Sequence, residues 1–146
     1  MEREFETIRL RLRPFIADDL DHLHHLWINP DVRRYLWDDL EISRDRAAGE
    51  IVKSSESLRS RGFGFWALIL KDDETLIGFC GLRVFADPAD IELLYGIAPS
   101  HWGQGLATEA AAAVLNYGFQ ACRLPKIYAG ADAPNRASFR VIENSE

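Results

Sequence analysis

A glycine-spaced turn between two regular segments is the feature that most constrains how this chain can fold. In the stretch HWGQGLATEA, Gly103, Gly105 and Ala107 alternate with larger residues. An apolar, strand-like run ends just before this turn, and an alanine-rich, helix-like run begins just after it. Glycine adopts positive φ angles and lets a ligand approach the backbone closely. Because the first amides of a helix lack partners within it and lie at the positive end of its dipole, the turn predicts a phosphate-binding site.

Two familiar phosphate motifs do not describe this turn. The Walker pattern GxxxxGK[ST] is absent from the sequence. The dinucleotide pattern GxGxxG would put its third glycine at Thr108, and it belongs near the start of a parallel sheet, whereas a long segment containing a hairpin precedes it here. Taken alone, Gly103 and Gly105 are equally compatible with a simple tight turn between a strand and a helix.

The apolar patterns predict one α/β (or α+β) domain over residues 1–146. Alternating or continuous apolar runs predict strands, two of them joined as a hairpin, over residues 7–15, 63–85, 89–99 and 126–132. Helical spacing predicts helices over residues 17–30, 43–62, 103–122 and 133–146, with Ser43 capping the second and Gly62 following its end. Hairpins together with one β-α-β crossover favour a mixed, mostly antiparallel sheet flanked by helices.

Composition excludes several classes of function. The net charge is −6, and no long basic run is present, which argues against a nucleic-acid partner. No apolar run is long enough to span a membrane, and the N-terminus is too charged for a secretory signal. Two cysteines without a CxxC pair are typical of a reducing compartment, so we expect a cytoplasmic protein. His22, His24 and His25 lack the further ligands that zinc requires, so no metal is expected.

The turn and its surroundings resemble the GNAT acyltransferase superfamily. The acyl-coenzyme A motif of that family, R/Q-x-x-G-x-G/A, lies between its fourth strand and its third helix. Gly105 and Ala107 match the G-x-A part, and Trp102 stands at the R/Q position. HWGQGLATEA is similar to the form of this motif in the ribosomal-protein N-acetyltransferase (RimJ/RimL-type) branch. Three segments extend the resemblance over nearly the whole chain: residues 8–36, 91–105 and 126–143.

The resemblance implies a GNAT-like fold with an acyl-coenzyme A opening between strands four and five, acetyl-CoA as co-substrate and no metal. It implies that backbone groups hold the diphosphate, contributed by Trp102, Gly103, Gln104, Gly105, Leu106 and Ala107. It also implies backbone donors to the thioester carbonyl and the pantetheine arm, expected at Ile97 and Ala98. Asn135 is expected to contact the pantetheine arm, although a helix N-cap role fits it equally. Ser138 is expected to protonate the departing thiolate or to bind the cofactor, and Trp37 is expected near the acceptor.

Glu92 is the expected general base, because the resemblance puts a glutamate of this strand in the substrate cleft. A solvent-facing position on the strand fits alternation equally well. The predicted function is acetyl-CoA-dependent N-acetyl transfer to a primary amine, either a protein N-terminus or a small amine, by direct attack in a ternary complex. The alternative is a non-catalytic acyl-CoA-binding or inactive truncated relative, and a different phosphate-ligand domain is a third reading.

Family members continue beyond the fourth helix into two more strands, so the chain is expected to be C-terminally truncated relative to the family pattern. The strand over residues 126–132 would then have an unpaired edge. Such an edge leaves room for strand exchange or a homodimer.

Overall fold

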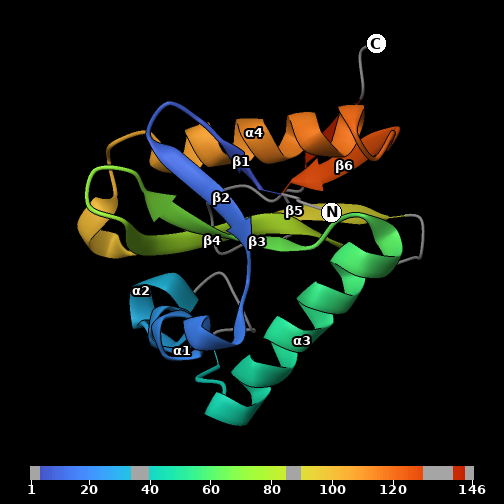
Figure 1. The fold of residues 1–146 in the computed structure, drawn as a ribbon. Helices are drawn as coiled ribbons and strands as arrows, with labels where there is room; N and C mark the ends of the chain where they lie inside the picture. The colour runs from blue at the N-terminus through green and yellow to red at the C-terminus, as the bar shows by residue number, and fades with distance from the viewer. Residues whose placement is uncertain (1–3, 34–39, 85–89, 130–139, 144–146) are drawn as a thin grey trace.

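The computed structural model describes residues 4–33, 40–84, 90–129 and 140–143, the last of these as backbone only. Its strands form one sheet in the sequential order β1-β2-β3-β4-β5-β6-β7 (Figure 1). Their bounds are β1 Phe5–Glu6, β2 Leu10–Pro14, β3 Phe65–Leu70, β4 Thr75–Val84, β5 Ile91–Ile97, β6 Lys126–Ala129 and β7 Arg140–Glu143. Neighbouring strands are antiparallel except β5 and β6, which are parallel. The predicted mixed, mostly antiparallel sheet is confirmed.

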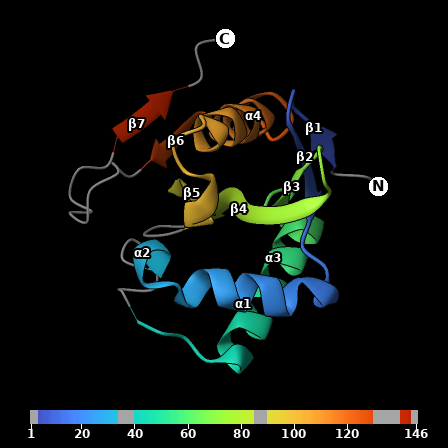
Figure 2. The ribbon, with the colours of Figure 1, turned by 90° about the vertical axis from the view of Figure 1, so that its left-hand side faces the viewer.

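Helices cover both faces of the sheet. The helices are α1 Leu20–Ile28, α2 Pro30–Arg33, α3 Arg44–Arg61 and α4 Leu106–Gln120, with short 3₁₀ turns at Ala17–Asp19 and Pro99–His101. Helix α4 joins the parallel strands β5 and β6 and lies on one face of the sheet (Figure 2). Helices α1 to α3 lie on the other face. Parallel neighbours need such a crossover, and the helix provides it.

Each face of the sheet has its own apolar core. Leu106, Ala110 and Val114 of α4 pack with Leu10 and Leu12 of β2 in one cluster. The second cluster joins α1, α2 and α3 to the opposite side of the strands, and its members include Leu23, Trp27, Val32, Ile51, Phe65, Phe79 and Leu94. The alternation in β2 therefore places Leu10 and Leu12 inside, as expected. Ile8 does not join them, because it lies in the connection between β1 and β2 and is 91% exposed.

Helix α3 begins and ends at the residues that the sequence predicts. The hydroxyl of Ser43 accepts a hydrogen bond from the amide of Arg46 at 3.0 Å. Gly62 ends the helix with a φ of 88°, and its amide donates to the carbonyls of Ser57 and Leu58. A serine N-cap and a left-handed glycine C-cap satisfy backbone groups that the helix leaves unpaired.

The C-terminal helix predicted over residues 133–146 is wrong for its described part. Residues 140–143 form β7, which pairs antiparallel with β6. Strand β6 therefore has neighbours on both sides, and the unpaired edge that suggested a homodimer is covered. The physical reason is twofold: Val141 and Ile142 are β-branched residues that favour strands, and an open edge is stabilised by a partner strand.

Candidate functional site

The glycine turn lies at the N-terminus of α4. Gly103 and Gly105 both have a φ of 78°, and Gly105 is the N-cap residue of the helix. A β-carbon on Gly103 would meet nothing within 4 Å, and one on Gly105 would meet only Nη2 of Arg9, at 3.5 Å. The glycines are therefore required by the left-handed backbone and not by crowding.

The backbone amides of this turn are available to a ligand. Among the described residues, none accepts a hydrogen bond from the amides of residues 103–108, whereas the next amide, that of Glu109, donates to the carbonyl of Gly105. Gly103 and Gly105 are exposed, and so is Gln104 between them. Unpaired amides at the positive end of a 15-residue helix fit a diphosphate group.

Of the two backbone donors predicted at the end of β5, Ile97 and Ala98, the structure contradicts one. The amide of Ala98 donates to the carbonyl of Ile77 at 2.8 Å, so its only N–H is used within the sheet. Ala98 is therefore not available as the backbone donor to the cofactor that the family resemblance implies. In an antiparallel ladder, successive residues point their backbone groups to opposite sides. The backbone N–H and carbonyl of Ile97 therefore point away from β4. The carbonyl accepts a hydrogen bond from Nε1 of Trp102 at 2.7 Å.

Among the described residues, strands β5 and β6 pair over a short length. Glu92 lies opposite Tyr128 and Leu93 opposite Ala129, where the described part of β6 ends. Strand β5 continues beyond this pairing to Ile97. The backbone groups of Ile97 thus face away from β4 and lie next to the glycine turn, where the carbonyl accepts from Trp102. This is the pair of strands between which the family resemblance puts the acyl-coenzyme A opening.

Glu92 is buried in the middle of the sheet. Its side chain is 1% exposed, which excludes the solvent-facing alternative. It lies directly opposite Arg83 of β4, and Nε of Arg83 donates to Oε1 of Glu92 at 2.7 Å. By alternation along β5, Glu92 shares the face of Leu94, which packs against helices α1 to α3. The arginine partner is itself half-exposed, so the ion pair connects the buried carboxylate to the surface of the sheet.

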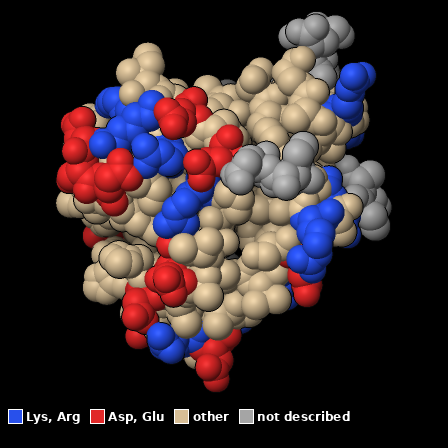
Figure 3. All heavy atoms as spheres, in the orientation of Figure 1, with Lys and Arg blue, Asp and Glu red and all other residues tan. Residues whose placement is uncertain are grey.

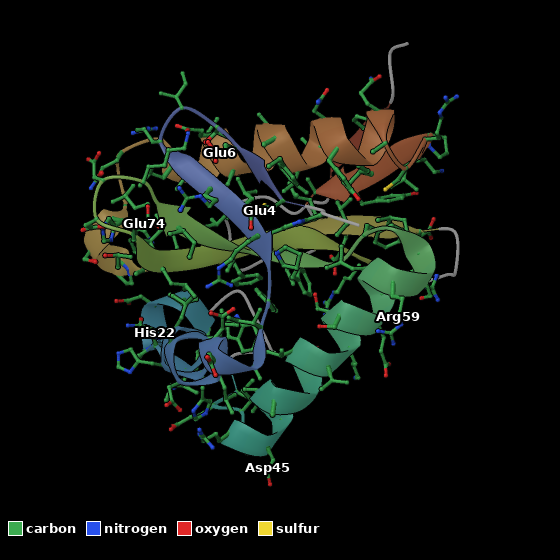
Figure 4. The ribbon with its side chains drawn as sticks, in the orientation of Figure 1. Glu4, Glu6, His22, Asp45, Arg59 and Glu74 are labelled. Atoms are coloured by element: carbon green, nitrogen blue, oxygen red, sulfur yellow. The ribbon has the colours of Figure 1, made fainter. Side chains whose placement is uncertain are left out.

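Three predicted site residues lie outside the described residues: Trp37, Asn135 and Ser138. In the part of the chain that is described, no group of three or more His, Cys, Asp or Glu side chains could hold a metal ion. His22 projects outward from α1 (Figure 4), and His24 Nε2 lies 2.9 Å from the carbonyl of Ile42. No described helix is long and apolar enough to cross a membrane.

Sequence reasoning missed Arg9 and Glu109. The pattern of the first strand places Arg9 only on its polar face, and nothing in the sequence distinguishes Glu109. In the structure, Nη1 of Arg9 donates to the carbonyl of Gln104 in the glycine turn at 2.8 Å, and Nε donates to Oε1 of Glu109 at 2.8 Å. No local pattern signals these contacts, because the partners are separated by 95 and 100 residues in the sequence.

Comparison with known proteins decides the family, because residues 9–145 match the acetyltransferase (GNAT) domain family. The chain belongs to this family and is an acyltransferase. A curated relative, an uncharacterized N-acetyltransferase p20 of Bacillus licheniformis, is 29% identical over 94% of this chain and 78% of its own length. The spermidine N(1)-acetyltransferase of Escherichia coli K12 is 26% identical over 90% of this chain and 69% of its own length.

Solved GNAT structures share the fold. An acetyltransferase from Agrobacterium tumefaciens superimposes with a TM-score of 0.79 at 23% identity, covering 94% of this chain and 79% of the other. RimL, a ribosomal L7/L12 α-N-protein acetyltransferase in complex with coenzyme A, superimposes with a TM-score of 0.70 at 16% identity, covering 90% and 76%. These likenesses establish the GNAT fold of the chain.

Proposed function

We propose that this GNAT enzyme transfers the acetyl group of acetyl-CoA directly to a primary amine while both substrates are bound. The observation that carries the proposal is the glycine turn of α4, where two left-handed glycines leave a run of amides without described acceptors. A diphosphate is the group of acetyl-CoA that such a concave run of amides fits. We assign its binding to the backbone of residues 102–107.

The chain's own residues have separate roles in the proposed reaction. Acetyl-CoA supplies the acetyl group as a thioester. The amide of Ile97 is proposed to donate to the thioester carbonyl, where negative charge develops as the amine attacks. Glu92, oriented by Arg83, is proposed to receive the proton that the amine must lose, directly or through water. The new amide bond forms as the bond from carbon to sulfur breaks, and the thiolate then takes a proton. By family resemblance, Ser138 is the proposed donor of that proton and Asn135 a contact of the pantetheine arm.

The acceptor is proposed to be a small alkyl amine or a protein N-terminus. The similarity to a spermidine acetyltransferase supports the first class, and the RimJ/RimL-like sequence of the turn supports the second. Trp37, in the segment between α2 and α3, is the proposed acceptor contact. The negative net charge of −6 favours a cationic acceptor of either class.

The test follows thiol release from acetyl-CoA with spermidine, simple alkyl amines and peptides that have a free N-terminus. We expect turnover with at least one acceptor and a decrease in kcat of about 10²–10⁴-fold in Glu92→Gln, the range typical of general-base loss. Glu74→Gln is the matched control, because Glu74 forms a surface ion pair with Arg11 and no described contact joins it to Glu92. Tight binding of acetyl-CoA without turnover on any amine would make the protein an acyl-CoA binder instead. Full activity in Glu92→Gln would remove Glu92 from the mechanism.

A further inference from the structure

The connection between β1 and β2 is fastened to the first turn of α4 by the carboxylate of Glu109. Its Oε2 accepts hydrogen bonds from the hydroxyl of Thr7 and from the amide of Arg9, the latter at 2.8 Å. Its Oε1 accepts from Nε of Arg9 at 2.8 Å. Burial alone would raise the pKa of Glu109, but the hydrogen bonds from Thr7 and Arg9 outweigh burial and lower it. The carboxylate therefore serves as a charged anchor for Arg9.

The backbone of Arg9 is held from a second side as well. Its carbonyl accepts a hydrogen bond from the amide of Lys71 at 2.9 Å, next to the end of β3. The side chain of Lys71 also donates to the carbonyl of Thr7 at 2.7 Å. Basic and acidic side chains gather over this end of the sheet (Figure 3), where Glu6 and Glu74 also lie (Figure 4). Arg9 thus extends from a fixed position toward the glycine turn.

The guanidinium of Arg9 determines which way one peptide group of the turn points. Nη1 donates to the carbonyl oxygen of Gln104, so that carbonyl points toward Arg9. The structure contains no cis peptide bond among its described residues. In a trans peptide the carbonyl and the following N–H point in opposite directions. The amide of Gly105 therefore points away from Arg9, and no described residue accepts a hydrogen bond from it.

Gly105 cannot hold this orientation by itself. Glycine adopts positive and negative φ angles about equally, so the peptide between Gln104 and Gly105 is able to flip. After a flip, the carbonyl of Gln104 would take the place of the Gly105 amide and present negative charge to a diphosphate. The hydrogen bond from Arg9 opposes this flip.

We propose that Arg9 is a positioning residue of the cofactor site, which holds the Gln104–Gly105 peptide so that the Gly105 amide faces the diphosphate of acetyl-CoA. Glu109 acts through Arg9, because it anchors the guanidinium. The inference rests on the proposed function, since it assumes that the turn binds the diphosphate. Arg9 itself lies on the opposite side of this peptide and is not a ligand.

The test compares two acetyl donors. Acetyl-CoA carries the diphosphate, whereas S-acetylpantetheine has the same thioester and pantetheine arm without any phosphate. For Arg9→Gln we expect the KM for acetyl-CoA to increase about tenfold, the order expected for loss of a charged hydrogen bond, with kcat nearly unchanged. The kcat/KM for S-acetylpantetheine should stay at the wild-type value. A merely structural role would lower activity with both donors.

Arg11→Gln is the matched control. Arg11 lies on the adjoining strand β2 and forms an ion pair with Glu74 at 2.6 Å, but it does not contact the turn. Arg11→Gln should leave kcat and KM unchanged for both acetyl donors. Glu109→Gln should also raise the KM for acetyl-CoA, but by a smaller factor than Arg9→Gln does. The double variant Arg9→Gln/Glu109→Gln should match Arg9→Gln alone, because the two residues act in series.

Three results would overturn the inference. The first is an acetyl-CoA KM in Arg9→Gln equal to that in Arg11→Gln while the wild-type enzyme is active. The second is an equal loss with both donors, and the third is multiplicative effects in the double variant. If Arg9→Gln does not fold, Glu109→Gln provides the same comparison of donors. A wild-type protein that does not use acetyl-CoA at all would instead overturn the proposed function, and this inference with it.

Discussion

Replacing Gly105 by alanine isolates the strain that the turn imposes on its backbone. Gly105 has φ 78° and ψ 8°, in the left-handed region. An L-residue other than glycine costs about 1–2 kcal/mol there, because its β-carbon approaches the backbone too closely. The new methyl group would meet no other atom of the surroundings closer than Nη2 of Arg9 at 3.5 Å, which is an ordinary contact. We therefore expect the free energy of unfolding to decrease by about 1–2 kcal/mol from strain alone.

Replacing Gly49 by alanine is expected to increase the free energy of unfolding, the opposite of the effect at Gly105. Gly49 lies in the interior of α3 and is exposed, and a β-carbon added there would meet no atom within 4 Å. Alanine in a helix interior is more stable than glycine by roughly 0.5–1 kcal/mol, because glycine loses more backbone freedom on folding. Neither site is crowded, so the φ angle of each glycine decides whether alanine lowers or raises the free energy of unfolding.

Urea unfolding and thermal unfolding of the two variants measure both effects. For a chain of this size, the transition midpoint should fall by about 2–8 °C in Gly105→Ala and rise by about 1–4 °C in Gly49→Ala. The affinity for acetyl-CoA, measured by titration, should decrease in Gly105→Ala and stay unchanged in Gly49→Ala. A Gly105→Ala protein as stable as the wild type would refute the left-handed geometry. A normal acetyl-CoA affinity in that variant would contradict the role of the turn.

Two further predictions concern titration and thiol chemistry. The pKa of Glu109 is lowered in the folded protein from its ordinary value of 4.5, so its ionised form stabilises the fold above that pH and this contribution disappears as the pH falls through the lowered pKa. The stability difference between wild type and Glu109→Gln in urea should therefore be largest near neutral pH and shrink in acid; a difference that does not change with pH would count against the anchor. Burial raises the pKa of the Cys80 thiol, whereas Cys122 is only half-buried. Ellman's reagent should thus react with Cys122 in the folded protein and with Cys80 only in denaturant, and rapid reaction of both thiols would contradict the buried position of Cys80.

Local features of the fold could be predicted from the sequence because their causes are local. The alternation of Leu10 and Leu12, the Ser43 cap and the Gly62 stop each depend on a few neighbouring residues. The glycine turn belongs to the same class: its left-handed backbone follows from Gly103 and Gly105 between a strand and a helix. The ligand and the chemistry proposed for this turn come from the resemblance to the GNAT family, because periodicity alone indicates neither.

Two outcomes depended on contacts between distant segments and could not be predicted. The contacts of Arg9 with Gln104 and Glu109 join segments far apart in the chain, and an arginine at the end of an alternating strand has the same pattern whether it is solvated or bonded. Strand β7 forms in place of the expected helix because β6 offers it an edge. Helix propensity near residues 140–143 is modest, so a tertiary partner outweighs it.

Glu92 shows why alternation fails in a central strand. Strand β5 is covered by α4 on one face and by α1 to α3 on the other, so both sets of its side chains are largely buried. A glutamate in such a strand has no solvent face, and a buried carboxylate without a partner is strongly destabilising. The partner is Arg83, directly opposite on β4. An ion pair whose carboxylate is buried adds little stability compared with apolar residues of similar volume, because desolvation of the carboxylate offsets the attraction. Stability therefore gives no reason for a carboxylate at this position, whereas the proposed proton transfer does.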